Sequence, residues 1–138
     1  MDWVLDASVA LAWGLPDEAS VQADRFLGGV SAGDVLWVPA LWWYEIANAL
    51  IFAERRKRLT EADGVHLREL YRMLPIETDA TVGPETIERL LTLGREYQLS
   101  GYDATYLELA LRKGVGLATL DRNLRSATEK AGAAVFRP

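Results

Sequence analysis

The stretch Trp3-Val4-Leu5-Asp6, near the start of the chain, determines which fold we expect. Three apolar residues that end at an acid are typical of a short buried strand. Similar apolar runs occupy residues 35–38 and 116–119, and an acid follows the second of them closely. We interpret these three segments as buried strands. Ile76 and residues 133–136 are weaker candidates, the last for an edge strand.

Helical stretches lie between these runs, and several carry signals for where a helix begins or ends. Thr60 and Asp63 have the spacing of a capping box. Pro84 stands where the first helical turn tolerates proline, and Gly114 follows the last apolar residue of its stretch. The predicted helices cover, approximately, residues 18–27, 41–56, 61–74, 84–97, 103–113 and 122–131. Because strands alternate with helices, the sequence predicts an α/β fold with a central, largely parallel sheet.

Length and composition indicate one soluble domain over residues 1–138. Half of the residues are apolar and a quarter are charged, which is typical of a globular protein. The absence of cysteine excludes disulfides, thiolate zinc sites and cysteine nucleophiles, and it suits a reducing compartment. The longest apolar run, residues 35–44, contains Pro39 and is too short to span a bilayer. We therefore expect a cytoplasmic protein that does not associate with membranes.

The net charge of −5 argues against broad adhesion to nucleic acid, which depends on many lysine and arginine contacts to phosphates. It does not exclude a nuclease, because bound divalent cations would neutralise part of the acidic charge. A basic run at residues 55–58 could contact phosphates. It could equally be a solvated helix end favoured by the helix dipole.

Three aspartates occupy positions where either a structural or a catalytic role is plausible. Asp6 ends the first strand, and Asp121 follows the run at 116–119, so both lie at the carboxyl ends of strands, where parallel sheets bind ligands. Each could instead cap the helix that follows it. Asp103 begins a predicted helix, where the dipole favours an acid without any function.

Glu45 is harder to explain as a structural residue. It lies in a helix that is apolar on nearly every face except the stripe formed by Glu45 and Asn48. A buried carboxylate needs a partner charge, a metal or a raised pKa. No basic residue lies one turn away on this helix, so we expect the partner of Glu45 to come from elsewhere in the fold.

The four acids match the preferences of magnesium and manganese, which bind oxygen ligands. In phosphodiester hydrolysis, such ions activate water and neutralise the phosphate oxygens. No histidine or cysteine is required, and the single His66 has no second histidine with which to form a zinc site.

Four short motifs, in this order, resemble the acidic motifs of PIN domains. They are Val4-Leu5-Asp6-Ala7-Ser8, Glu45-Ile46-Ala47-Asn48-Ala49-Leu50, Leu99-Ser100-Gly101-Tyr102-Asp103-Ala104-Thr105-Tyr106-Leu107 and Leu117-Ala118-Thr119-Leu120-Asp121. The ordered set, which covers essentially the whole chain, is most similar to the VapC-like toxins of toxin–antitoxin modules.

This resemblance implies a PIN-like three-layer α/β/α sandwich and an endoribonuclease that depends on Mg²⁺ or Mn²⁺. It also implies a homodimer that a cognate antitoxin neutralises. The residues that the resemblance assigns to catalysis and metal binding are Asp6, Glu45, Asp103 and Asp121, with Ser8, Asn48 and Thr119 as polar supports. The chain departs from some relatives at Asn123, where they carry a further acid, which puts a second metal position in doubt.

Two other functions are compatible with parts of this pattern. A haloacid-dehalogenase-like phosphatase also has an aspartate after its first strand, but its general acid would fall at position 8, which is Ser8 here. A PIN-like module that binds RNA or protein without cutting is the other alternative. Retention of all four acids argues against it, since a carboxylate cluster repels itself.

Five tryptophans, of which Trp37, Trp42 and Trp43 are clustered, are many for a chain of this size. Some of them could line an interface, where tryptophan is enriched. Packing around the second strand and its helix would account for at least one or two.

Overall fold

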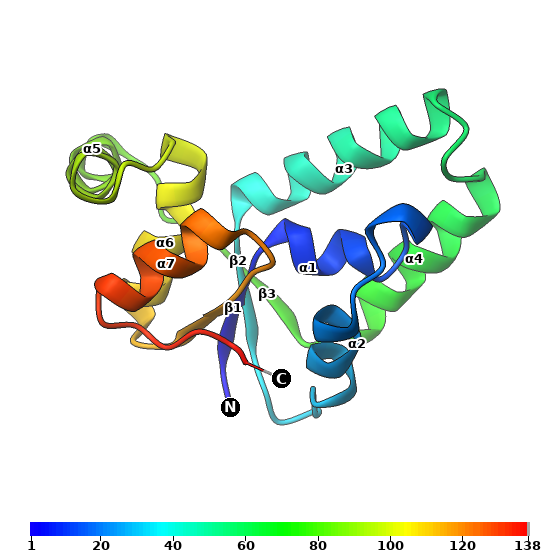
Figure 1. The fold of residues 1–138 in the computed structure, drawn as a ribbon, viewed down its shortest axis with the longest axis horizontal. Helices are drawn as coiled ribbons and strands as arrows, with labels where there is room; N and C mark the ends of the chain where they lie inside the picture. The colour runs from blue at the N-terminus through cyan, green and yellow to red at the C-terminus, as the bar shows by residue number, and fades with distance from the viewer. Residues whose placement is uncertain (138) are drawn as a thin grey trace.

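The computed structural model describes residues 1–137, which form a four-stranded sheet in the order β3-β2-β1-β4 (Figure 1). All three neighbouring pairs of strands are parallel. The strands are β1 (Trp3–Leu5), β2 (Leu36–Pro39), β3 (Ile76–Asp79) and β4 (Gly116–Ala118). The predicted parallel sheet is confirmed, including a strand at Ile76.

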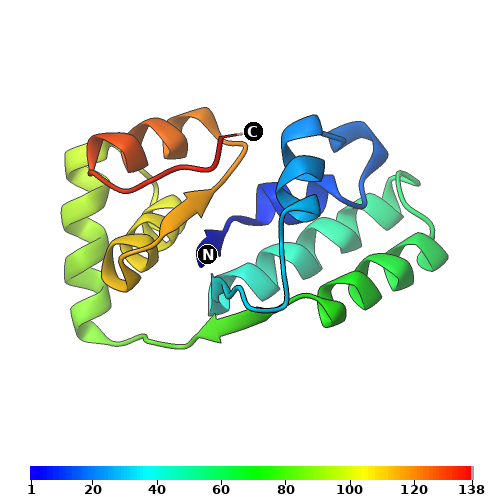
Figure 2. The ribbon, with the colours of Figure 1, turned by 90° about the horizontal axis from the view of Figure 1, so that it is seen from below.

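Helices cover both faces of this sheet, as Figures 1 and 2 show. One face carries α1 (Ala7–Ala12), the 3₁₀ helix η1 (Pro16–Glu18), α2 (Val21–Gly28), α3 (Ala40–Arg55) and α4 (Glu61–Met73). The other carries α5 (Pro84–Tyr97), α6 (Gly101–Lys113) and α7 (Arg122–Lys130). Crossovers between parallel strands are right-handed, so helices change face when the chain reverses its direction across the sheet. The chain moves outward from β1 to β3 and then returns to β4, which confirms the predicted sandwich.

The predicted helix signals are found at the ends of three helices. The hydroxyl of Thr60 accepts the backbone N–H of Asp63, and the Asp63 carboxylate accepts that of Thr60, so the capping box is present. Pro84 occupies the first turn of α5. Gly114 ends α6 in the left-handed region with φ of 66°, which glycine adopts at low cost.

Three predicted boundaries were wrong. The helix expected at 18–27 is divided into η1 and α2, and the Ser20 hydroxyl accepts the Ala23 N–H at the start of α2. Helix α6 begins two residues earlier than expected, after Ser100. The edge strand expected at 133–136 is a single parallel bridge between Leu117 and Val135.

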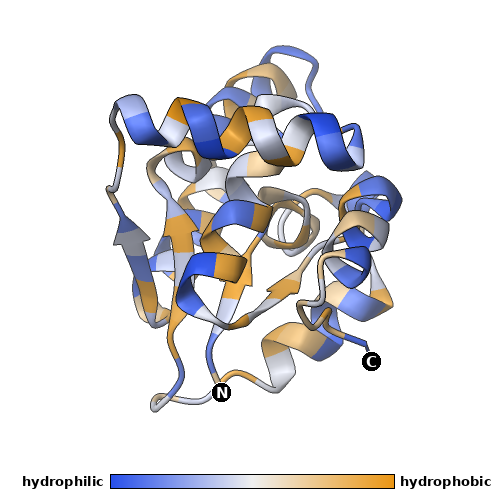
Figure 3. Ribbon diagram, turned by 90° about the vertical axis from the view of Figure 1, so that its left-hand side faces the viewer, coloured by the Kyte–Doolittle hydropathy of each residue, from blue (hydrophilic) through white to orange (hydrophobic). Residues whose placement is uncertain are grey.

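The core accounts for most of the tryptophans. Trp42 is fully buried, and Trp3 and Trp13 pack against the core. Trp37 lies beneath the Lys113 ammonium, which is 3.9 Å from the ring centroid. Only Trp43 is substantially exposed among them, at 44%, and its ring N–H donates to Thr78. Figure 3 shows the apolar inner strands and the more polar outer strand β3.

Among residues 1–137, no helix is long and apolar enough to cross a membrane.

An ion-pair network joins the end of β3 to the last turn of α6. The Arg112 guanidinium donates two 3.0 Å hydrogen bonds to Asp79 and a further pair of 3.0 Å bonds to Glu108. The side chains of both acids are about nine-tenths buried. The Lys113 ammonium lies 3.5 Å from Asp79. This network anchors the connection that leads from the sheet to α5.

We predict that Asp79→Asn destabilises the protein at pH 7 by about 1–3 kcal/mol, because Arg112 loses a charged partner. The guanidinium holds the pKa of Asp79 well below its usual range. A depressed folded pKa stabilises the native state above the unfolded pKa of about 4, and this stabilisation is lost as the pH falls through the folded pKa. The difference between variant and wild type in urea unfolding should therefore shrink at low pH. Glu69→Gln, which breaks an exposed pair with Arg72, should change little at either pH.

Candidate active site

The site lies where the chain changes direction across the sheet, at the carboxyl ends of β1 and β4. Leu5 and Ala118 are paired in register, and the Asp6 N–H donates to the Ala118 carbonyl at 3.0 Å. The next residues of the two strands, Asp6 and Thr119, are therefore neighbours. The connections from β1 and into β4 run on opposite faces of the sheet, and such a switch point is where open α/β sheets bind ligands.

Asp6 is almost completely buried, with an exposed fraction of 7%. Its Oδ2 accepts the Ser8 hydroxyl at 2.6 Å and the Thr119 hydroxyl at 2.7 Å. Within residues 1–137, its Oδ1 accepts no side-chain hydrogen bond. The two hydroxyls thus hold the carboxylate in one orientation and leave one oxygen free for another ligand.

The environment of Asp6 disfavours its negative charge. Burial raises the pKa of Asp6, and the nearby carboxylates of Asp103 and Asp121 raise it further, while the two hydroxyl donors partly oppose them. A cation placed among these carboxylates would reverse the effect, because opposite charge favours the ionised form.

Ser8 and Thr119 also organise the segment after β4. The Ser8 hydroxyl accepts the Leu120 N–H, and the Thr119 hydroxyl accepts the Asp121 N–H, both at 3.0 Å. The Arg125 guanidinium donates to the Thr119 carbonyl at 2.9 Å. These contacts bring the hydroxyls of Ser8 and Thr119 next to Asp6 and to the segment that follows β4.

Asp121 is the N-cap of α7, and its Oδ1 accepts the Leu124 N–H at 2.9 Å. The capping interpretation is therefore confirmed. It does not exclude a second role, since only one oxygen is used and the charge is close enough to raise the pKa values of Asp6 and Asp103.

Asp103 is half-buried in the first turn of α6, where its N–H donates to the Ser100 hydroxyl. Burial raises the pKa of Asp103, with a further contribution from Asp121. The helix-dipole interpretation alone would favour ionisation. Burial and the like charge of Asp121 act in the opposite direction.

The apolar composition of the helix around Glu45 predicted that this helix is mostly buried, which was wrong. Helix α3 exposes several large apolar residues, and Glu45 is itself half-buried. Burial nevertheless raises the pKa of Glu45, and Asp6 and Asp103 add to the shift. Its side chain therefore belongs to the same electrostatic cluster as the aspartates.

From elsewhere in the fold Glu45 receives a neutral donor and not a partner charge, because the Tyr106 hydroxyl donates to Glu45 Oε1. Burial raises the pKa of Tyr106 well above its usual range, and the hydrogen bond to the Glu45 carboxylate raises it further. The Tyr106 hydroxyl therefore remains protonated and acts as a donor. The sequence motif contained Tyr106 but assigned it no role. Its spacing of three residues from Asp103, which places both on one face of α6, was the available signal.

Within residues 1–137, the other sequence candidates donate or accept no side-chain hydrogen bond at this centre. Asn48 is exposed on α3, and none of the side-chain hydrogen bonds within residues 1–137 involves it. Asn123 is exposed in the first turn of α7. The basic run begins ten residues after Glu45, about 15 Å along α3. Within it, Arg58 pairs with Asp17 and Glu18, so that residue serves a structural contact.

The donor set suits a hard divalent cation that retains water. Within the described chain, no three acids are close enough to form a ligand group for one ion by themselves. Magnesium commonly binds through one or two carboxylates together with water and substrate phosphate. The free Oδ1 of Asp6 is compatible with that mode of binding, since the pKa values of Asp6, Glu45 and Asp103 are all raised.

Known proteins are similar to this chain in sequence and in fold. Ribonuclease VapC3 of Pyrobaculum aerophilum is 34% identical over 128 residues, which cover 90% of this chain and 92% of VapC3. The crystal structure of PAE2754 from Pyrobaculum aerophilum has a TM-score of 0.67 at 25% identity, covering 98% of this chain and 89% of that one. A toxin-antitoxin complex from Klebsiella pneumoniae contains a chain with a TM-score of 0.60 at 18% identity, covering 98% and 96%.

The profile of the PIN domain family matches residues 3–130, which include all four acids. This match and the 34% identity to a VapC ribonuclease over most of both chains show that the protein belongs to the PIN domain family, as a VapC-like member.

Proposed function

We propose that this protein is a metal-dependent endoribonuclease that acts as the toxin of a toxin–antitoxin module. The observation that carries the proposal is the buried Asp6 carboxylate, with one oxygen held by hydroxyls and the other free, beside Asp103 and Asp121. The similarity to VapC3, whose name describes a ribonuclease, supports RNA as the substrate. Residues 1–138 would act as a single PIN domain in the cytoplasm.

The proposed roles follow from the geometry. Asp6, Glu45, Asp103 and Asp121 would hold Mg²⁺ or Mn²⁺, either directly or through water. When bound, the metal would activate water and neutralise charge on the phosphate. Ser8 and Thr119 would orient Asp6, and the buried Tyr106 hydroxyl would orient Glu45. Asn48 would remain at the edge of the site, where it could contact RNA.

A cognate antitoxin is the proposed protein partner, in line with the toxin-antitoxin complex that shares this fold. We also propose a homodimer. Exposed apolar side chains on α3, namely Tyr44, Ile51 and Phe52, offer a surface that association would cover.

The first prediction is that neutralising any of the four acids lowers Mn²⁺-dependent RNA cleavage by about a hundredfold or more. The reason is that metal-assisted charge stabilisation is worth several kcal/mol, and about 1.4 kcal/mol is tenfold in rate. The variants are Asp6→Asn, Glu45→Gln, Asp103→Asn and Asp121→Asn, tested on protein free of antitoxin, with EDTA as the metal-free reference.

Glu54→Gln is the matched control, because Glu54 is an exposed acid on α3 beyond Glu45. It should retain wild-type cleavage. Wild-type rates in two or more of the four variants would contradict the assignment of the acids. If the wild type binds RNA in Mn²⁺ but does not cleave it, the alternative of a PIN-like module that binds without cutting is favoured.

The second prediction concerns stability without metal. A carboxylate whose folded pKa is raised destabilises the native state increasingly as pH rises from its unfolded pKa through its folded pKa. Asp103→Asn removes one such group, so in EDTA at neutral pH the variant should melt at the same temperature as wild type or higher. It should also gain less from Mn²⁺, which stabilises wild type by about 2.7 kcal/mol at a hundred times its dissociation constant.

A simple helix-start acid would behave in the opposite way. Asp103→Asn would then cost about 0.3–1 kcal/mol, and the response to Mn²⁺ would equal that of wild type. Thermal melts of the wild type and of Asp103→Asn, each in EDTA and in Mn²⁺, give the four melting temperatures that this comparison needs.

The third prediction is that the chain is dimeric at micromolar concentration and that Phe52→Glu shifts it toward monomer, because a buried unpaired charge opposes association. Light scattering measures the mass, and Met73→Glu, at an exposed residue at the end of α4, is the control. A monomeric wild type would overturn the proposed dimer.

A further inference from the structure

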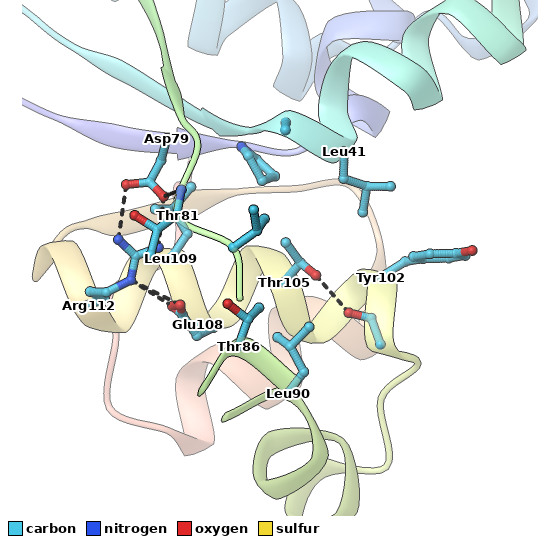
Figure 4. Close-up of a pocket in the computed structure, with 14 residues that line it drawn as sticks. Leu41, Asp79, Thr81, Thr86, Leu90, Tyr102, Thr105, Glu108, Leu109 and Arg112 are labelled. Carbon is cyan, nitrogen blue, oxygen red and sulfur yellow. Dashed lines mark hydrogen bonds and ion pairs between the residues drawn. The ribbon is translucent and has the colours of Figure 1, made fainter. Parts of the chain in front are cut away.

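A cavity of about 320 Å³ lies between α5, the connection from β3 to α5, and α6 (Figure 4). Its size is at the lower end of the range for small-molecule sites. Leucine side chains from three helices form much of its wall, namely Leu41, Leu90 and Leu109. It is distinct from the carboxylate cluster, none of whose four acids lines it.

The cavity nevertheless lies next to that cluster, because the same helices border both. Tyr102 lines the cavity and precedes Asp103 on α6. Leu41 lines it one turn before Glu45 on α3, about 6 Å along the helix axis. A nucleotide beside a phosphate held at the carboxylates would therefore be within reach of the cavity.

The two ends of the cavity differ in chemistry. In Figure 4, the Asp79–Arg112–Glu108 network lies at one end and Tyr102 lies at the other. Two acids and the two bases Arg112 and Lys113 meet in this network, so its charges balance. A balanced polar end does not attract a phosphate, whereas its hydrogen-bonding groups suit the polar edge of a neutral, flat molecule.

Tyr102 supplies a surface for stacking, with an exposed fraction of 68%. Proteins recognise single-stranded RNA by splaying bases out, stacking them on aromatic rings and hydrogen-bonding their edges. Apolar walls, a neutral polar end and an exposed aromatic ring at the other end provide each of these elements.

We propose that this cavity binds one base of the RNA, adjacent to the phosphodiester bond that is cut, and so sets the base preference at that position. The inference rests on the proposed ribonuclease function. Tyr102 would stack on the base or on its neighbour, while Thr86 and the Arg112 network would face its edge.

The test fills the cavity with Thr86→Trp on α5, beside the matched control Thr92→Trp, an exposed threonine of the same helix that does not line the cavity. Cleavage ends are sequenced after digestion of a randomised RNA pool in Mn²⁺. Wild type and Thr92→Trp should share a base preference next to the cut. Thr86→Trp should lose it, with kcat/KM on the preferred RNA lower by about tenfold.

Tyr102→Ala is the second variant, since truncating an exposed side chain leaves the core intact. It should lower kcat/KM on the preferred RNA in the same direction. An unchanged base preference in both Thr86→Trp and Tyr102→Ala would overturn the proposal, as would a Thr86→Trp variant that cuts normally but no longer binds a protein partner.

A second measurement does not depend on cleavage. The four nucleosides, which carry no phosphate, are titrated into the wild-type protein in EDTA and followed by methyl NMR. At least one nucleoside should shift the methyl signals of Thr86 and Leu90 in the wild type and in Thr92→Trp. In Thr86→Trp, the same nucleoside should leave the methyl signals of Leu90 unchanged. Absence of any shift in wild type contradicts the base site, whereas absence of RNA cleavage contradicts the nuclease.

Discussion

The buried carboxylate of Asp6 is the feature on which the rest of the site depends. Removing an ionised carboxylate from water is costly unless its charge is matched. The hydroxyls of Ser8 and Thr119 satisfy one oxygen, and they can do so because β1 and β4 end side by side. The carboxylate is also subject to the like charges of Asp103 and Asp121, which a divalent cation would compensate. The parallel sheet thus brings negative charge together at one edge, and a bound metal ion would neutralise part of that charge.

Much of the fold could be predicted from local patterns, because the decisive interactions lie within a few residues of one another. The capping box at Thr60 and Asp63 and the left-handed Gly114 depend only on neighbouring residues. The short strand Trp3–Leu5 was recognisable from its apolar side chains, and the acid at its end marked the edge of the sheet at which we propose the site. The same locality explains why Asp121 was recognised as a cap.

The remaining features depend on contacts between distant parts of the chain. Tyr106 became a partner of Glu45 only when α3 and α6 were brought together across 61 positions. The degree of burial of α3 was overestimated, because its composition does not reveal which face lacks a covering helix. Residues 133–136 form only a bridge, in which Val135 pairs with Leu117 of β4, and their apolar composition did not reveal how short that pairing is.

The most direct test of the shared metal site is a crystal structure of the protein in Mn²⁺, with the ion located by its anomalous scattering. We expect a peak within about 2.0–2.3 Å of Asp6 Oδ1, with Glu45, Asp103 and Asp121 as further ligands, directly or through water. Full occupancy at another place, with the Asp6 carboxylate bound only to Ser8 and Thr119, would contradict the proposed role of the four acids.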